Sequence, residues 1–162
     1  MPDPRLRITR RRLPHWRFPG ATYFVTFRLQ SGKLSAEERR LVLQHIRSGD
    51  PRFYELRAVQ VMPDHVHMLL YPGPARSLTQ VMKGIKGVTA RKLNEKRGTK
   101  GHVWQDEYYD RIMRDNDEFV EKLQYMLHNP LKYGLIDDPL QYDGWYMKEV
   151  ADRNVCPTNR GE

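Results

Sequence analysis

Four stretches rich in apolar and aromatic side chains predict β-strands. These stretches are residues 22–29, 53–62, 65–71 and 103–113. In the first stretch every second side chain is apolar, which predicts a strand with one buried face. The second and third stretches are separated by the short Pro63-Asp64 turn, so they predict an antiparallel hairpin.

Elsewhere the apolar residues recur every three or four positions, the spacing of amphipathic helices. One predicted helix follows a capping box formed by Ser35 and Glu38, a second spans residues 77–97, and a third is capped by Asp115 and Glu118. The resulting order is β, α, β, β, α, β, α. It predicts an α+β fold, a ferredoxin-like antiparallel sheet with helices packed mainly on one face.

The composition divides the chain into three parts. Residues 1–20 are dense in arginine and proline and cannot bury enough apolar surface to fold alone, so they predict a mobile basic arm. Residues 21–147 are expected to form a single domain. Residues 148–162 are polar and aperiodic, which predicts a C-terminal tail.

Charge and cysteine content narrow the classes of partner. Lysine and arginine number 28 against 20 acidic residues, and the formal charge of +8 favours polyanions, nucleic acid above all. The single cysteine, Cys156, excludes an internal disulfide and a cysteine-rich zinc site. No apolar run approaches the roughly 18 residues of a membrane span, so we expect a soluble, cytoplasmic protein without a membrane partner.

His65 and His67 stand two positions apart on a predicted strand. Both rings should therefore leave the same face, where they could hold one metal ion. Two histidines on a solvated sheet edge would give the same pattern, since no third ligand lies nearby in the sequence.

Tyr125 lies on the third predicted helix, away from its apolar stripe. At about 100° per residue, Tyr125 is separated from Phe119 and Leu123, and Asn129 follows one turn later on the same edge. A phenol beside an oxygen ligand suits nucleophilic phosphoryl transfer. A surface tyrosine with a helix-ending asparagine before Pro130 is the alternative.

Basic residues gather in two regions that could contact DNA. These are Lys83, Lys86, Arg91 and Arg97 on the second predicted helix, and Arg10, Arg11, Arg12 and Trp16 in the N-terminal arm. A cationic helix can follow a phosphate backbone, and tryptophan beside arginine suits stacking on unpaired bases. A solvated helix and a solubilising tail are the alternatives.

Four blocks of sequence resemble, in the same order, the REP-associated tyrosine transposases, relatives of the single-tyrosine insertion-sequence transposases of the HUH nuclease superfamily. The blocks are RRRLPHWRFPGATYFVTFRL, MPDHVHMLL, HVWQDEYYDRIMRD and LQYMLHNPLKYGL. The resemblance covers residues 10–146. It implies that His65 and His67 bind a metal, that Tyr125 is the nucleophile, and that Asn129 is the third ligand, where insertion-sequence relatives often have glutamine.

The same resemblance implies an activity and its requirements. The protein would be a metal-dependent single-strand DNA endonuclease and strand transferase that uses Mg²⁺ or Mn²⁺ and forms a 5′-phosphotyrosine intermediate. Its partner would be single-stranded hairpin DNA from repetitive palindromic elements of a bacterial nucleoid, and it would act as a monomer more readily than as a dimer. The alternatives are a catalytically inactive binder of hairpin DNA or RNA, and a nuclease whose nucleophile is water.

Overall fold

The structure, a computed structural model, describes residues 22–148, in which five strands and three α-helices occur. In chain order the elements are β1 (Tyr23–Arg28), α1 (Ala36–Ser48), β2 (Glu55–Val61), β3 (His65–Tyr71), α2 (Leu78–Arg97), β4 (Tyr109–Ile112), α3 (Asn116–Lys132), the short 3-10 helix η3 (Pro139–Gln141) and β5 (Trp145–Met147). The predicted basic arm and all but the first residue of the predicted tail lie outside the described residues.

The strands form one antiparallel sheet in the order β4-β1-β3-β2-β5. Its first four members have the ferredoxin-like arrangement, so the predicted fold class is confirmed. β2 and β3 form the predicted hairpin, in which Val61 lies opposite Val66. β3 is the central strand of the sheet.

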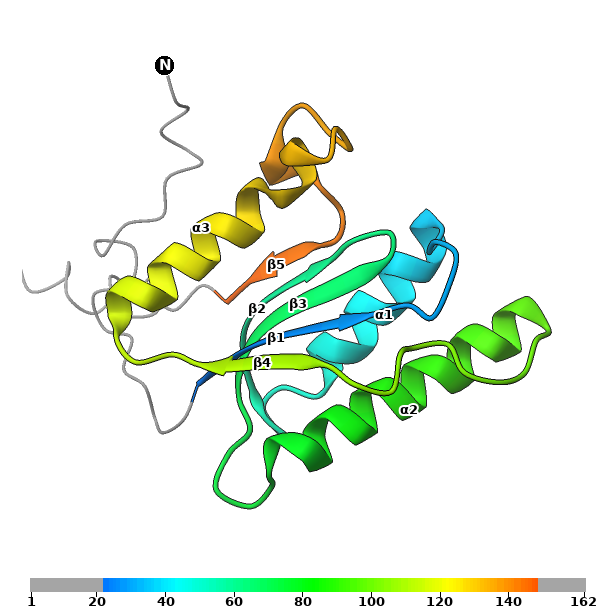
Figure 1. Ribbon diagram of the computed structural model, residues 1–162, viewed down its shortest axis with the longest axis horizontal. Helices are drawn as coiled ribbons and strands as arrows, with labels where there is room; N and C mark the ends of the chain where they lie inside the picture. Colours follow the sequence, from blue (N-terminus) through cyan, green and yellow to red (C-terminus); the bar gives the residue numbers. More distant parts are fainter. Residues whose placement is uncertain (1–21, 149–162) are drawn as a thin grey trace, which may run out of the picture.

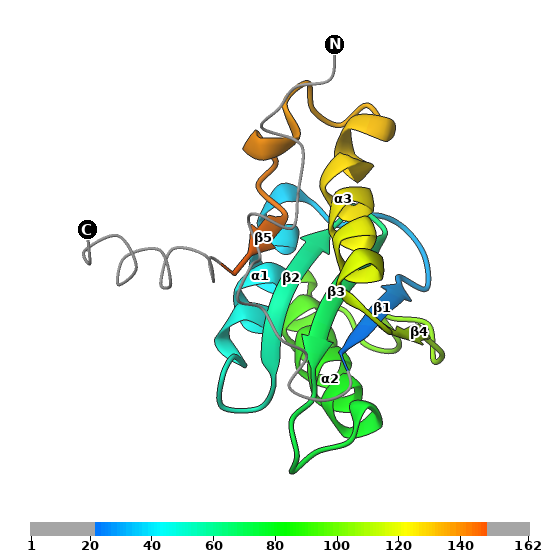
Figure 2. The same ribbon diagram turned by 90° about the vertical axis from the view of Figure 1, so that its left-hand side faces the viewer.

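Helices cover both faces of the sheet, with α1 and α2 on one side and α3 on the other (Figures 1 and 2). Val25 and Phe27 of β1 belong to the core under α1 and α2, whereas Phe24 packs with Phe119 of α3. Two of the three helices share a face, as predicted. The expectation of a half-buried β1 is wrong, because Phe24 and Thr26 on the face predicted to be solvated are buried too, Phe24 in the core beneath α3.

Local signals define where the helices begin and end. Both reciprocal hydrogen bonds of the capping box at Ser35 are present, and α2 begins with a second box between Ser77 and Gln80. Asp115 accepts a hydrogen bond from the backbone N–H of Glu118 at 2.9 Å and so caps α3. Within residues 22–148, no helix has the length and apolar character to cross a membrane.

Candidate active site

The two histidines of β3 face α3. Side chains alternate between the faces of a strand, and Leu69, two residues beyond His67, packs in the core beneath α3. Val66, between the histidines, packs on the opposite face against α1 and α2. Both imidazoles are buried, with 5% and 4% of their surface exposed. The prediction that the rings share a face is confirmed, and the solvated sheet edge is excluded because β3 is central.

Each imidazole is held through its Nδ1 atom by a neighbouring side chain. Nδ1 of His67 lies 2.7 Å from the hydroxyl of Thr26, and Nδ1 of His65 lies 2.7 Å from a carboxylate oxygen of Asp64. When both Nδ1 atoms carry the proton and donate it, each Nε2 has the lone pair that a metal requires.

Burial keeps these rings neutral. It lowers the pKa of His67 to about 3, with smaller contributions from the neighbouring charges. Burial also lowers the pKa of His65, while the hydrogen bond and charge of Asp64 act in the opposite direction. Neutral imidazole is the form that binds a cation, so protons do not compete for this site near pH 7.

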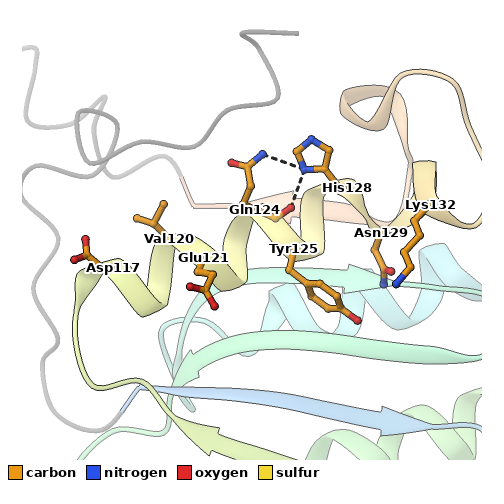
Figure 3. A pocket seen from close by; sticks show the side chains of 8 residues that line it. All are labelled: Asp117, Val120, Glu121, Gln124, Tyr125, His128, Asn129 and Lys132. Carbon is orange, nitrogen blue, oxygen red and sulfur yellow. Dashed lines mark hydrogen bonds between the residues drawn. The ribbon is translucent and has the colours of Figure 1, made fainter. Parts of the chain in front are cut away.

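α3 presents Tyr125 to the histidines. The ring centroids of Tyr125 and His67 are 5.5 Å apart with an interplanar angle of 67°, and those of His65 and His67 are 4.7 Å apart. Figure 3 shows the phenol pointing from α3 toward the sheet. Tyr125 is nevertheless 44% exposed, so it is accessible to a substrate while its ring adjoins a buried imidazole.

Asn129 lies one turn beyond Tyr125 and also points toward the sheet (Figure 3). Its side chain is 1% exposed, and neither Oδ1 nor Nδ2 has a hydrogen-bond partner among the described residues. The alternative that Asn129 ends the helix is wrong, because α3 continues through Pro130 to Lys132. Proline here is in the last turn, where it removes only one helical N–H donor.

Gln60 is a buried polar residue that the sequence analysis missed. It lies on β2 directly opposite His67, and it is completely buried. Its Oε1 has no hydrogen-bond partner in the described part of the chain. The signal was the Pro63-Asp64 turn, since extending the hairpin from that turn pairs residue 60 with residue 67.

The buried side chains of this site include atoms that could serve as ligands of a divalent cation. Nε2 of His67, Oδ1 of Asn129 and Oε1 of Gln60 are buried acceptors without partners in residues 22–148, a costly arrangement unless a ligand satisfies them. No group of three His, Cys, Asp or Glu side chains suited to a metal occurs in the same residues. A cation bound by the two imidazoles would therefore take any further protein ligand from an amide oxygen, and the identity of the metal stays a prediction.

Tyr125 forms a ridge between two clefts. The first, of about 580 Å³, is bounded by β1, the residues leading into β4, and the first half of α3, and is called the β1 cleft below. The second, of about 600 Å³, runs along α3 and is lined by Gln124, His128 and Asn129 among others (Figure 3). Both sides of the phenol are therefore open to a bound strand.

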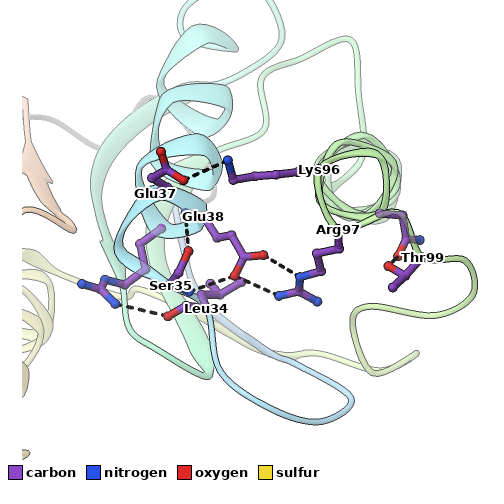
Figure 4. Close-up of polar contacts among 9 residues, drawn as sticks. Leu34, Ser35, Glu37, Glu38, Lys96, Arg97 and Thr99 are labelled. Atoms are coloured by element: carbon purple, nitrogen blue, oxygen red, sulfur yellow. Dashed lines mark hydrogen bonds and ion pairs between the residues drawn. The ribbon is translucent and has the colours of Figure 1, made fainter.

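The basic residues predicted on α2 lie on the other side of the sheet from Tyr125. Arg97 donates two hydrogen bonds to Glu38, at 2.6 and 3.2 Å, and fastens α2 to α1 (Figure 4). Lys86 donates to the backbone carbonyls of Gln105 and Asp106. Arg97 and Lys86 thus have structural contacts that the sequence did not predict.

Lys83 and Arg91 are exposed on α2, and Arg91 lies 3.9 Å from Glu95. The structure does not bring them to Tyr125. The other predicted DNA contacts, Arg10, Arg11, Arg12 and Trp16, lie outside the described residues. The role of these six residues in DNA binding stays a prediction.

Residues 37–126, more than half of the chain, match the family model described as "Transposase IS200 like". This chain belongs to the IS200-like transposase family. The matched span of this transposase-family chain includes His65, His67 and Tyr125, and it ends three residues before Asn129.

Curated relatives of this family member match it over part of their length. It is 23% identical over 94 residues to a REP-associated tyrosine transposase of Haemophilus influenzae, a match that covers 52% of this chain and 53% of the relative. It is 41% identical over 39 residues to the ISDra2 transposase TnpA of Deinococcus radiodurans, covering 24% and 28% respectively. The chain thus spans about half, or less, of the curated relatives it matches.

A solved structure shares the fold over most of its length. It is that of a REP-associated tyrosine transposase bound to a REP hairpin. The TM-score is 0.61 at 19% sequence identity, and the superposition covers 89% of this chain and 84% of the other. At this identity the likeness establishes the fold of the IS200-like chain.

Proposed function

We propose that this chain is a single-strand DNA endonuclease and strand transferase that cuts at hairpin-forming repetitive palindromic DNA, with Tyr125 as the nucleophile. The observation that carries the proposal is the position of an exposed phenol whose ring centroid lies 5.5 Å from that of a buried, neutral imidazole with an unpartnered Nε2. A buried acceptor next to an accessible nucleophile has little value for stability, but it suits phosphoryl transfer.

Membership of a transposase family supports a DNA-processing activity, and the relatives suggest the substrate. The relative with the same fold is described as bound to a REP hairpin. We transfer that ligand class, a hairpin with an unpaired flank, to this chain as part of the proposal. Its net charge of +8 agrees with a polyanionic substrate.

We further propose that His65, His67 and Asn129 hold Mg²⁺ or Mn²⁺. When bound, the cation would polarise the scissile phosphodiester and reduce the charge that the nucleophile meets. Thr26 and Asp64 orient the two imidazoles through their Nδ1 atoms, so these two ligands are held in place before the cation binds.

The cleavage step is a transesterification that needs no other reactant. The Tyr125 oxygen forms a bond to phosphorus while the bond from phosphorus to the 3′ oxygen breaks. The leaving oxygen keeps the electron pair and takes up a proton, and the phenol releases one. The products are a 5′-phosphotyrosine and a free 3′-OH. Attack by a 3′-OH on the phosphotyrosine reverses the step and joins strands.

The test is to incubate the protein with labelled single-stranded hairpin oligonucleotides and Mn²⁺ or Mg²⁺, and to look for protein-linked DNA on denaturing gels. We expect an adduct with the wild-type protein and none with Tyr125→Phe or His65→Ala. Tyr133→Phe is the matched control, because Tyr133 is 58% exposed and its ring centroid lies 6.3 Å from that of His65. This control variant should form the adduct as the wild type does.

The other outcomes would overturn the proposal in distinguishable ways. An adduct absent from Tyr133→Phe but kept in Tyr125→Phe would move the nucleophile to Tyr133. Cleavage without any adduct would identify water as the nucleophile. Tight hairpin binding without cleavage in either metal would favour an inactive DNA- or RNA-binding regulator.

A further inference from the structure

The β1 cleft places two cations beside Tyr125 that the sequence analysis did not single out. Lys122 lies one turn before Tyr125 on α3, with its Nζ 4.9 Å from the ring centroid of Phe24 and 5.9 Å from that of Tyr125. Arg28 ends β1 opposite His65. Both line the cleft together with His67 and Tyr125.

Both cations lie near the buried histidines. Arg28 pairs with His65 across β1 and β3, and the Nζ of Lys122 lies 5.9 Å from the ring centroid of Tyr125, which is itself 5.5 Å from that of His67. Two positive charges therefore direct their field at the same place as the unpartnered Nε2 of His67. Such a field attracts a phosphate, which carries the opposite charge.

Neither cation forms an ion pair with a residue that the structure describes, although, after the hydrogen bond with His65, the charge of Arg28 contributes to lowering the pKa of Asp64. In residues 22–148, no carboxylate forms an ion pair with Arg28 or Lys122, in contrast to Arg97, which is bound to Glu38. Glu107 is the acid that lines the cleft, and it is exposed and makes no ion pair with either cation. Unpaired cations along a groove are the feature by which proteins bind a single-stranded phosphate backbone.

An aromatic surface completes the cleft. Tyr109 lies on the edge strand β4, lines the cleft, and is 54% exposed. Tyr108 lines it as well and is half-buried. Exposed aromatic rings next to cations provide stacking surfaces for unpaired bases, whereas a base-paired stem offers no free base faces to them.

We propose that the β1 cleft binds the unpaired strand at the cleavage site, with Lys122 on the scissile phosphate, Arg28 on a neighbouring phosphate and Tyr109 stacked on a base. This inference rests on the proposed function and adds to it the place where the substrate enters. Lys122 then contacts the reacting group itself, and Arg28 and Tyr109 set the position of the strand.

The first test measures binding without chemistry. A fluorescent, unstructured single-stranded oligodeoxynucleotide is titrated with the protein in EDTA at several salt concentrations. For single strands, log affinity decreases linearly with log salt concentration, and the magnitude of this negative slope falls by roughly 0.7 for each phosphate that the protein no longer neutralises. We therefore expect weaker binding and a shallower slope for Arg28→Gln and for Lys122→Gln, and a larger change for the double variant.

The matched controls separate this surface from general charge. Lys92→Gln removes an exposed lysine from α2, on the opposite face of the sheet, and should leave binding of the short strand unchanged. Tyr109→Ala should weaken binding of the single strand but not that of a duplex of the same sequence. Titration of Tyr109→Ala with Mn²⁺ should give the wild-type affinity, because this residue is uncharged and is not a proposed ligand. Arg28→Gln and Lys122→Gln each remove a positive charge near the site, so these variants should bind Mn²⁺ at least as tightly as the wild type.

The second test measures adduct formation with the same variants. A wild-type adduct together with unchanged binding, salt slope and adduct rate in Arg28→Gln/Lys122→Gln would overturn the inference and leave the proposed function intact. The same follows if Lys92→Gln weakens binding as much as Lys122→Gln does. If the wild-type protein forms no adduct, the proposed function fails. The metal-free titration would then still decide whether the cleft binds single strands.

Discussion

Asn129 keeps two polar atoms away from water without a hydrogen bond in residues 22–148, and Nε2 of His67 is in the same condition. A buried amide of this kind costs about 1–3 kcal/mol when nothing satisfies it. Proteins tolerate such costs at functional sites, where a ligand later provides the missing interactions. The asparagine is thus better explained by binding than by folding.

Replacing Asn129 by leucine should make the metal-free protein more stable and the site inactive. The side chains have similar volumes, so we expect the free energy of unfolding in EDTA to rise by about 1–2 kcal/mol as the unsatisfied amide is removed. Mn²⁺ affinity and adduct formation should fall sharply. Urea unfolding in EDTA and a Mn²⁺ titration measure both effects.

Asn94→Leu is the control for this substitution. Asn94 also lies on a helix, but its amide is bonded to the carbonyl of Gly101 and to the hydroxyl of Thr99. This variant should lose stability and keep Mn²⁺ binding. A destabilised Asn129→Leu protein with wild-type Mn²⁺ affinity would show that Asn129 is an ordinary structural residue.

Residues of the site differ in how far the sequence could reveal them. The positions of His65, His67 and Tyr125 follow from local periodicity, because alternation and helical phase are properties of neighbouring residues. Arg28 and Lys122 do not follow from it, since they come from distant segments and neither stands in a basic run. The dense basic charge that led to the predicted DNA contacts lies on α2 instead, on the opposite face of the sheet.

At the scale of the elements, a partly buried ion pair joins the start of α1 to the end of α2. Glu38 completes the capping box at Ser35 and accepts two hydrogen bonds from Arg97 (Figure 4). The hydrogen bond from Arg97 is the largest cause that holds the pKa of Glu38 at about 2 instead of its usual 4.5. Burial acts against this effect.

This ion pair predicts a defined loss of stability in acid. Because the folded-state pKa of Glu38 is depressed, its contribution is fully present above about pH 4.5 and is lost as the pH falls toward about 2. The loss should be at most about 3 kcal/mol. Urea unfolding between pH 6 and pH 2.5 should show it in the wild type and a smaller decline in Glu38→Gln.

The neighbouring Glu37 gives the comparison. It lies 3.0 Å from Lys96, but its side chain is exposed, so Glu37→Gln should leave most of the acid-induced decline in place. Equal pH dependence in the wild type and in Glu38→Gln would refute the assignment to this ion pair.

The elements themselves were predictable where their signals are local. Caps and apolar spacing predicted α1, α2 and α3 closely. The observed fourth strand is shorter than the predicted residues 103–113, because Trp104 makes only an isolated bridge to Leu29 before β4 begins at Tyr109. η3 and β5 were missed. Each has three residues, too few for a period, and β5 exists only through its pairing with β2.

At the scale of the molecule, the segment after α3 returns to close the sheet at β2. The hydroxyl of Tyr142 donates a 2.7 Å hydrogen bond to the carbonyl of Val61, and the N–H of Val61 donates to the carbonyl of Gly144 at 2.8 Å. The backbone at Gly144 lies so close to Val61 that a Cβ there would collide with the carbonyl oxygen. Glycine is therefore required at this point of closure.

Gly144→Ala should destabilise the protein by about 1–3 kcal/mol, the usual cost of overpacking. At Gly84 in α2 a Cβ would meet nothing within 4 Å. Gly84→Ala should therefore stabilise the protein by about 0.5–1 kcal/mol. Thermal unfolding distinguishes them by sign. A Gly144→Ala protein as stable as the wild type would mean that the closing segment adjusts without cost.

The proposed metal ligands come from two different elements, and this has a consequence for how the activity could be regulated. Asn129 and Tyr125 are on α3, whereas His65 and His67 are on β3. A cation bound by ligands from both elements would hold the helix against the sheet. Cation binding and packing of α3 on the sheet would then stabilise each other by thermodynamic linkage. Anything that lifted α3 would withdraw the nucleophile and a ligand together, and a half-active intermediate would be scarce.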